Sequence, residues 1–465
     1  MNNWLLDASR LQFAITAAFH MTFPAVTVGL SMFLVFLYGA YLKTNTHIYL
    51  LMYRFWLKIF AVGFGLGVVA GIVMTFEFGL NWAGYANAVG PILGVIISME
   101  VITAFFLEAG FLGIMLYGQG RVRKPIQFLA ICMVSLGSLL STTWILSANS
   151  WMQTPAGYTL VNGQFQPTDW IAAIFNPSFL YRFPHILLGV LISTSFLVVG
   201  TAAWYLLRQT HLEFAHRTFS LGLGVLSLLV PLQLSMGDTV AGEMSGFQPA
   251  KFQAVEGNWD STNTGYNLFI VTDQAQQRNI VQITIPGLGS IISNHDLTLK
   301  KPVPGLRQTP VDRQPPMVFV FYGFRVMFYL ATLMFVVTAA GLWLRLRHKL
   351  YTTRWFHRLV LLMTPAGVLA VIGGWVTAET GRQPYVVYGQ LTTTNAVSPL
   401  DPVVVITSVV LFIITYLILL SIYVLYLVRS IQNGPGDTGT PVLVPKATET
   451  GSSGTSVNSA FAPGD

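Results

Sequence analysis

Nine long apolar runs separated by polar connections dominate the pattern of this 465-residue chain. Each run is close to the roughly 17–25 residues that a helix needs to cross a bilayer. Backbone groups find no hydrogen-bond partner in lipid, so spanning segments of this kind must be helical. We therefore predict an all-α, polytopic membrane protein. Its transmembrane helices are expected at about residues 11–40, 55–78, 92–118, 125–148, 181–207, 218–236, 317–344, 357–378 and 402–428.

Basic residues cluster in alternate connections, which predicts the orientation of the chain. The clusters are Lys43, Arg54 and Lys58; Arg121, Arg123 and Lys124; Arg208 and Arg217; and Arg345, Arg347, Lys349, Arg354 and Arg358. Connections rich in lysine and arginine face the cytoplasm, so we expect the N-terminus outside and the C-terminus inside. The first residues lack a basic region and a cleavage site, so no signal peptide is expected to be removed.

The composition agrees with this class, because 53% of the residues are hydrophobic and 9% are charged. So little polar surface excludes a soluble globule. The net charge of +7 comes from residues beside the apolar runs, so no nucleic-acid partner is expected. A single cysteine, Cys132, excludes an intrachain disulfide and a cysteine-ligated iron–sulfur cluster.

The connections divide the chain into four parts. Residues 1–236 carry six runs, 317–430 carry three, and residues 237–316 form a long polar connection on the predicted outer side. Loops of this length are functional or disordered, and its turn-rich pattern predicts a partly ordered flap. Residues 431–465 are rich in Gly, Ser, Thr and Pro, so we expect a disordered cytoplasmic tail.

Ionisable side chains interrupt the apolar runs, although hydrocarbon disfavours each of them by roughly 2.5–3.5 kcal/mol. They are His20, Glu100, Glu108, His185 and Arg325. Glu379 and Arg382 lie together where the eighth run ends, and Glu77, near the end of the second run, is expected to be interfacial. Given the predicted orientation, most of these groups fall in the outer half of the membrane. Such residues need partners, and a metal cofactor would provide one.

The histidines narrow the choice of cofactor, because only His20 and His185 of the eight lie deep in apolar runs. A haem–copper oxidase core or a four-helix cytochrome b core needs more intramembrane histidines than these, so no copper is expected. Haem iron also accepts methionine as an axial ligand. The residues available for two or three haems are His20, His185, Met327, Glu100 and Glu379.

Several motifs carry a resemblance to a known family. They are Ala17-Ala-Phe-His-Met21, Ser98-Met-Glu-Val, Phe105-Phe-Leu-Glu108, Trp144-Ile-Leu-Ser-Ala-Asn-Ser-Trp-Met-Gln153, Arg182-Phe-Pro-His185, Phe324-Arg-Val-Met327 and Glu379-Thr-Gly-Arg-Gln-Pro384. In order and topology, over about residues 1–430, they resemble subunit I of the cytochrome bd quinol oxidases. The chain resembles the branch of this family with a short quinol loop, which includes the cyanide-insensitive enzymes, although Tyr385 and the short connection after Gln383 depart from the pattern of many relatives.

The resemblance implies three haems. It implies His185 and Met327 as axial ligands of the low-spin haem b558, and His20, Glu100 and Glu379 around the high-spin haems b595 and d. Which of these binds which iron is open, as is haem b in place of haem d. Arg325 and Arg382 are interpreted as counter-charges for haem propionates or substrate, with pairing to Glu379 or to backbone carbonyls as the alternative.

The resemblance also implies partners and a location. Lys251 and Glu256 match the quinol site of the family, with ubiquinol or menaquinol as the substrate and O2 as the electron acceptor. A second polytopic subunit, and in some relatives a small single-span subunit, would complete the complex in the bacterial cytoplasmic membrane. A quinol oxidised on the outer side, with protons for oxygen reduction drawn from the cytoplasm, would generate a proton motive force.

Glu108 is the best candidate for a step in that proton path. It lies roughly 12 Å deeper than Glu100 on the same helix and about 80° around its axis, and a buried carboxyl suits a proton relay. The neighbouring run offers Ser135, Ser138, Ser141 and Thr142 to hydrate the gap, although helix packing explains small residues equally well.

Two rival classes predict different patterns. A transporter would place its ionisable residues near the membrane midplane and would show an inverted repeat, but no repeat is visible. A structural haem-binding anchor would not need the surplus of acidic groups around the second site, and haem d content would distinguish it.

Overall fold

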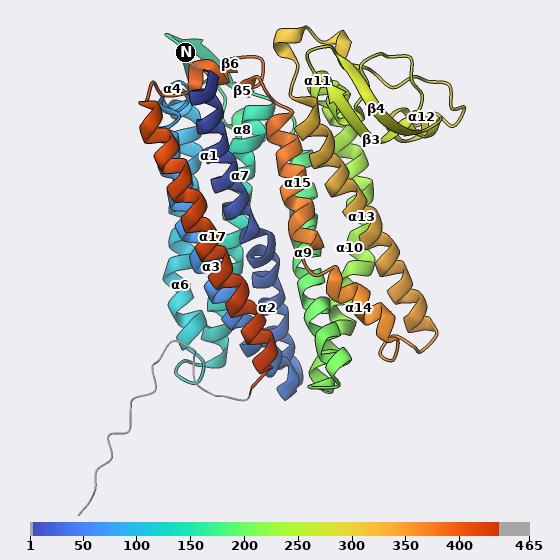
Figure 1. The fold of residues 1–465 in the computed structure, drawn as a ribbon. Coiled ribbons are helices and arrows are strands. Elements are labelled where there is room, and N and C mark those ends of the chain that lie inside the picture. The colour runs from blue at the N-terminus through green and yellow to red at the C-terminus, as the bar shows by residue number, and fades with distance from the viewer. Residues whose placement is uncertain (1–2, 437–465) are drawn as a thin grey trace, which may run out of the picture.

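The computed structural model describes residues 3–436, which form a bundle of long helices (Figure 1). In this described part, nine helical stretches are long and apolar enough to span a membrane, which confirms the predicted class. They are Trp4–Thr44, His47–Leu80, Ala83–Tyr117, Lys124–Gln153, Trp170–Arg208, Leu212–Phe247, Met317–Leu346, Arg354–Thr380 and Pro402–Asn433. The predicted tail lies outside the described residues from position 437 onward.

Four of these spans are interrupted, and the interruptions have local causes. The first span consists of two helices, α1 (Asn3–Thr22) and α2 (Pro24–Thr44). The eighth span also consists of two helices, α14 (Arg354–Leu362) and α15 (Ala366–Thr380). Pro24 and Pro365 lie at these two breaks, because proline cannot donate the helical backbone hydrogen bond. The fifth span consists of α8 (Trp170–Ile174) and α9 (Phe179–Arg208).

The third span contains two wider turns of π-helix. Its elements are α4 (Ala83–Val89), η1 (Gly90–Gly94), α5 (Val95–Glu100), η2 (Val101–Phe105) and α6 (Phe106–Tyr117). A π turn holds more residues than an α turn and is common at functional sites. Since η2 separates Glu100 from Glu108, it changes their relative direction, and both carboxylates point at α7. The predicted offset of 80° assumed an unbroken α-helix and is therefore wrong.

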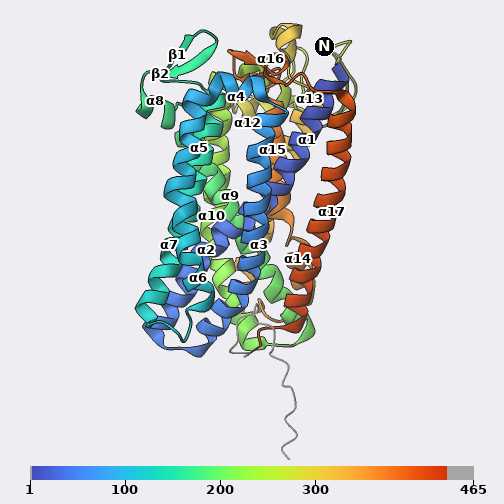
Figure 2. The same cartoon turned by 90° about the vertical axis from the view of Figure 1, so that its left-hand side faces the viewer.

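The other spans are continuous. They are α3 (His47–Leu80), α7 (Lys124–Gln153), α10 (Leu212–Phe247), α13 (Met317–Leu346) and α17 (Pro402–Asn433). The most apolar window of the α9 span is 72% buried, against 17% for α17. Helix α9 packs against α2, α10, α14 and α15, so it is the central helix, whereas α17 lies at the edge of the bundle (Figures 1 and 2).

Short elements cover one end of the bundle, which we call the N-terminal face because the chain begins there (Figures 1 and 2). They are α11 (Pro249–Glu256), α12 (Leu288–Asn294), α16 (Thr393–Ala396) and the 3-10 turns Leu306–Gln308 and Val311–Arg313. Three antiparallel hairpins pair β1 (Tyr158–Val161) with β2 (Gln164–Pro167), β3 (Tyr266–Asp273) with β4 (Arg278–Ile285), and β5 (Tyr385–Val387) with β6 (Leu391–Thr392). Residues 248–316 are called the roof loop below.

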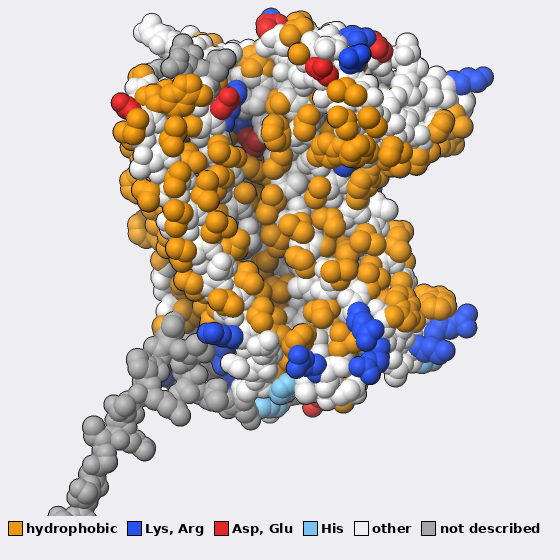
Figure 3. Space-filling model, in the orientation of Figure 1, with side chains coloured by type: hydrophobic (Ala, Val, Ile, Leu, Met, Phe, Trp, Pro, Cys, Tyr) orange, Lys and Arg blue, Asp and Glu red, His pale blue; other side chains and the backbone are white. Residues whose placement is uncertain are grey.

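Several predicted boundaries differ from the structure. Helix α10 continues to Phe247, so the long connection begins about ten residues after the predicted Gly237. The segment after Gly237 is polar, so a search for apolar runs does not include it in the helix. It lies at the N-terminal face, where a helix need not be apolar because it is no longer surrounded by hydrocarbon. Blue Lys and Arg side chains gather at the opposite face, where the predicted cytoplasmic loops lie (Figure 3).

The contact between α9 and α15 depends on the absence of a side chain at Gly367. A Cβ atom there would lie 2.3 Å from Ser193 Cα, so the helices would have to separate. We expect Gly367→Ala to lower the free energy of unfolding by about 1–3 kcal/mol, measured as a lower melting temperature of the purified protein. Gly224→Ala is the control, since its Cβ would meet nothing within 4 Å. Equal melting temperatures for the two variants would contradict this account of the contact.

Candidate active site

A large cavity lies inside the bundle, below the roof loop. Its volume is about 2090 Å³, roughly twice the upper end of the 300–1,000 Å³ range of small-molecule sites. Helices α1, α3, α7, α9, α10, α13 and α15 and the third span contribute to its walls. The candidate residues that line it are His20, Glu100, Glu108, His185, Lys251, Glu256, Met327, Glu379 and Arg382. Residues far apart in the sequence therefore share one cavity.

His20, near the end of α1, is held by α3. Its Nδ1 atom lies 3.1 Å from the carbonyl oxygen of Gly67, which leaves Nε2 as the available ring nitrogen. A Cβ on Gly71 would lie 3.1 Å from His20 Cε1, so the glycine provides room for the ring. A histidine that uses one nitrogen on a backbone carbonyl and keeps the other free has the usual arrangement of a metal ligand.

His185 and Met327 line the cavity from α9 and α13. His185 Nδ1 lies 3.2 Å from Gln233 Nε2, and this contact does not involve the other ring nitrogen, Nε2. A Cβ on Gly374 would lie 2.7 Å from Met327 Sδ, so the glycine leaves room for the thioether where it lies. One histidine and one methionine facing a common cavity form a donor set that suits a haem iron.

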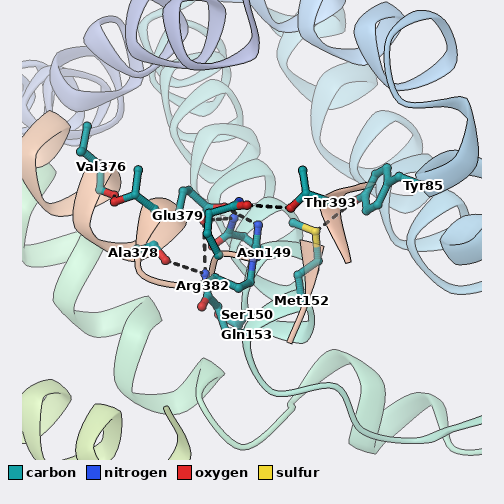
Figure 4. Close-up of polar contacts among 12 residues, drawn as sticks. Tyr85, Asn149, Ser150, Met152, Gln153, Val376, Ala378, Glu379, Arg382 and Thr393 are labelled. Atoms are coloured by element: carbon teal, nitrogen blue, oxygen red, sulfur yellow. Dashed lines mark hydrogen bonds and ion pairs between the residues drawn. The ribbon is translucent and has the colours of Figure 1, made fainter. Parts of the chain in front are cut away.

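A hydrogen-bonded network surrounds Glu379 at the end of α15 (Figure 4). Glu379 Oε1 accepts from Asn149 Nδ2 at 2.9 Å and from Gln153 Nε2 at 3.3 Å. Arg382 pairs with the second carboxylate oxygen. Arg182 donates to Asn149 Oδ1 at 2.5 Å. The network joins α7, α9 and α15 at the N-terminal face.

Arg382 has more donors than this network satisfies. It is 5% exposed, and its Nε and Nη1 groups are buried without a hydrogen-bond partner. An unsatisfied buried donor costs about 1–3 kcal/mol and calls for an explanation in a native structure. Because Arg382 lines the cavity, a carboxylate inside the cavity, such as a haem propionate, would satisfy it. The residues present therefore fit haem.

The acidic pair Glu100 and Glu108 faces α7 along one side of the cavity. Ser141 Oγ donates to Glu100 at 2.7 Å, and Ser138 Oγ donates to Glu108 at 2.6 Å. The two serines are three residues apart and lie on one face of the helix. Both carboxyls of the third span are therefore hydrogen-bonded to hydroxyl groups of α7.

Lys251 and Glu256, at the two ends of α11, are both 4% exposed. Lys251 Nζ donates to Gln153 Oε1 at 2.6 Å, and Ser293 Oγ donates to Glu256 at 2.8 Å. Burial, reinforced by Arg182 and Arg382, lowers the pKa of the Lys251 amine well below its usual range. Burial also raises the pKa of the Glu256 carboxyl, although the Arg325 cation opposes that shift. Both pKa shifts therefore favour the uncharged form of the side chain.

Arg325 is the one candidate that does not line the cavity within the described residues. It is 2% exposed, its Nε donates to the Asn267 carbonyl at 2.8 Å, and its guanidinium lies 4.2 Å from the centroid of the Tyr266 ring. Both terminal nitrogens are buried without a hydrogen-bond partner. The contacts attach α13 to the roof loop, and the role of Arg325 as a propionate counter-charge stays a prediction.

Two expectations from the sequence need correction or addition. Glu77 is not interfacial: it is 1% exposed and accepts a hydrogen bond of 2.5 Å from Thr16, because α1 covers it. Asn149, Gln153 and Arg182 belong to motifs that carry the family resemblance, but no role was predicted for them. The sequence feature that could have identified them is their position: they are polar residues at the ends of apolar runs, and Arg182 is itself one of them.

The comparisons with known proteins define the family. The family described as cytochrome bd terminal oxidase subunit I matches residues 8–435, so the chain belongs to this family. Subunit 1 of the cytochrome bd ubiquinol oxidase of Bacillus subtilis (strain 168) is 32% identical over 446 residues, covering 92% of this chain and 94% of that protein. Subunit 1 of the cytochrome bd-II ubiquinol oxidase of Escherichia coli (strain K12) is 31% identical over 502 residues, covering 93% and 97%.

The fold comparison agrees with the family. The structure of bd oxidase from Geobacillus thermodenitrificans superposes with a TM-score of 0.85 at 27% sequence identity, covering 94% of this chain and 100% of that one. The chain is thus subunit I of a cytochrome bd-type terminal oxidase. With its nine apolar helices in the described part, it is a multi-pass protein of the bacterial cytoplasmic membrane.

In the roof loop, the carboxylate of Asp296 accepts five hydrogen bonds. The donors are the Ser290 and Thr298 hydroxyls and the backbone amides of Thr298, Lys300 and Lys301. These bonds lower the pKa of the carboxyl, so their contribution is present above the ordinary aspartate pKa of about 3.9 and is lost as the pH falls through the lower folded value.

We therefore expect Asp296→Ala to increase hydrogen exchange of residues 288–304 at neutral pH, because the loop loses its shared acceptor. Asp312→Ala is the control, since the Asp312 side chain is 79% exposed and has only an ion pair with Arg313 at 4.0 Å. Equal exchange in wild type and Asp296→Ala would show that the carboxylate does not order the loop.

Proposed function

We propose that this chain is the subunit of a quinol:O2 oxidoreductase that binds two b haems and a haem d, without copper. The observation that carries the proposal is the single cavity, which connects Lys251 and Glu256 under the roof loop with His20, His185 and Met327 between the helices. Bound haem would supply the redox-active iron and the oxygen-binding position. In this proposal the protein supplies ligands, charges and the separation of quinol from oxygen chemistry.

His185 and Met327 would hold the low-spin haem b558, since they line the cavity from α9 and α13 and each lies next to a glycine, Gly237 and Gly374. His20, Glu100 and Glu379 would surround haems b595 and d, or a haem b in place of haem d. The unpaired donors of Arg382 support its role toward a propionate. The assignment of single ligands among these three residues to one iron is left open.

Lys251 and Glu256 would bind the quinol headgroup. A buried amine and a buried carboxyl can each exchange a hydrogen bond with a quinol oxygen, and the raised pKa of Glu256 suits a group that accepts a proton as the quinol is oxidised. The relatives are named as ubiquinol oxidases, and we propose ubiquinol or menaquinol as the substrate class.

Protons for oxygen reduction would enter from the face opposite the quinol site. Glu108 and Glu100, with Ser138 and Ser141, extend from the deeper part of the cavity toward its centre. The basic residues at the opposite face (Figure 3) support its assignment to the cytoplasm. Quinol oxidation outside and proton uptake from inside would make the reaction electrogenic.

The family description as subunit I supports a second polytopic subunit as partner. Apolar side chains on α17 are widely exposed in the chain alone, with Val403 at 72% and Leu417 at 59%. Lipid, the second subunit or a small single-span subunit would cover such surfaces. We propose that the active enzyme is this multi-subunit complex.

Replacing Met327 tests the assignment of the low-spin haem. We expect Met327→Leu to retain haem but to convert a low-spin spectrum to a high-spin one, because the leucine fills the space without offering an iron ligand. The optical spectrum of the purified complex measures this change. Met363→Leu is the control, since Met363 is 3% exposed and lies outside the cavity lining. An unaltered low-spin spectrum in Met327→Leu removes this residue from the ligand set.

Replacing Glu108 tests the proton path. We expect Glu108→Gln to slow oxygen consumption with excess quinol by about a hundredfold, while haem content stays constant. Oxygen uptake and the haem spectrum of the same preparation measure the two quantities. Glu213→Gln is the control, because Glu213 is an exposed carboxylate in the first turn of α10. Full activity in Glu108→Gln would exclude Glu108 from the path.

A further inference from the structure

Gln153 joins two parts of the cavity that the proposed function treats separately. It is the last residue of α7 and is 2% exposed. On one side of it lies the quinol-side amine of Lys251, and on the other side lies the carboxylate of Glu379, which the proposed function places beside the high-spin haems. A buried amide that hydrogen-bonds to a buried amine on one side and to a buried carboxylate on the other is an unusual position for a merely structural residue.

The contacts of Gln153 fix the direction of its amide. Its Oε1 accepts from Lys251 Nζ at 2.6 Å and from Gln248 Nε2 at 3.0 Å. Its Nε2 donates to Glu379 Oε1 and to the Ala378 carbonyl, both at 3.3 Å. The Gln248 amide nitrogen can only donate, and the Ala378 carbonyl and the Glu379 carboxylate can only accept. Rotation of the amide by half a turn would therefore break the contacts on both sides at once.

The charges on the two sides also influence each other. Burial, Arg182 and Arg382 lower the pKa of Lys251, whereas the Glu379 carboxylate raises it. Gln153 hydrogen-bonds to both groups, to the Lys251 amine through its oxygen and to the Glu379 carboxylate through its nitrogen. A change in the hydrogen bonds of Lys251, such as quinol binding, must alter what the Gln153 oxygen accepts.

We propose that Gln153 is a positioning residue that couples quinol binding at Lys251 to the orientation of Glu379 at the high-spin haem site. This inference rests on the proposed function of the two sites. It goes beyond that function, because it makes the geometry of the oxygen-reducing site depend on whether the quinol site is occupied. The side chain of Gln153 itself touches neither the quinol nor oxygen in this account.

Two substitutions in the full complex separate the contact of Gln153 with Lys251 from its contact with Glu379. Gln153→Leu removes both contacts. We therefore expect the quinol KM to rise by roughly tenfold and the high-spin bands of the reduced spectrum to shift. Gln153→Glu keeps an acceptor for Lys251 but brings a carboxylate beside Glu379. We therefore expect a KM within about threefold of wild type together with shifted high-spin bands.

A third readout tests the coupling directly. In wild type, a saturating concentration of a quinone-site inhibitor should shift the high-spin bands. In Gln153→Leu, the inhibitor should still bind but should not shift them. Gln127→Leu is the matched control, since Gln127 is a buried glutamine at the other end of α7. It should leave the KM and the inhibitor-induced shift at wild-type values.

The outcomes distinguish this inference from the proposed function. A wild-type complex without haem or quinol oxidation would overturn the proposed function itself. A haem-loaded, active wild type in which Gln153→Leu changes neither the KM nor the high-spin bands would overturn the inference alone. So would a Gln153→Leu enzyme whose high-spin bands still respond to the inhibitor, because the coupling would then bypass the amide.

Discussion

The exclusion of charge from hydrocarbon is the constraint on which the rest of this structure depends. Each ionisable side chain inside a span would be costly if it faced lipid, and most of these groups line one cavity instead. Glu379 is satisfied by Arg382, Asn149 and Gln153, and the acidic pair on the third span is satisfied by serines of α7. The polar site and the apolar exterior are thus two results of one requirement.

Glycines complete the site by providing room for the donor atoms. Gly71 allows the His20 ring to lie against α3, and Gly374 allows the Met327 thioether to lie against α15. Above them, the roof loop closes the cavity with α11, whose Lys251 and Glu256 are buried despite their charges. The arrangement places the part of the cavity under the roof loop and the part between the helices in contact with one hydrogen-bonded network.

Much of the fold could be predicted from the sequence, because apolar runs of spanning length have only one stable form in lipid. The candidate ligands could be found because polar residues in such runs are rare. The rest could not. The π turn before Glu108 leaves no periodic signal, the continuation of α10 beyond Gly237 is polar, and the burial of Glu77 depends on a covering helix. Gln153 lacks a charge, so only its neighbours in space reveal its importance.

The central claim is that the cavity holds a low-spin haem and an oxygen-reactive high-spin site. The most direct test is a dithionite-reduced-minus-oxidised absorption spectrum of the purified complex, recorded with and without carbon monoxide. The account predicts a low-spin b-type signal that carbon monoxide leaves unchanged, together with high-spin bands that it shifts. A complex without haem, or with haem that does not respond to carbon monoxide, would contradict the account.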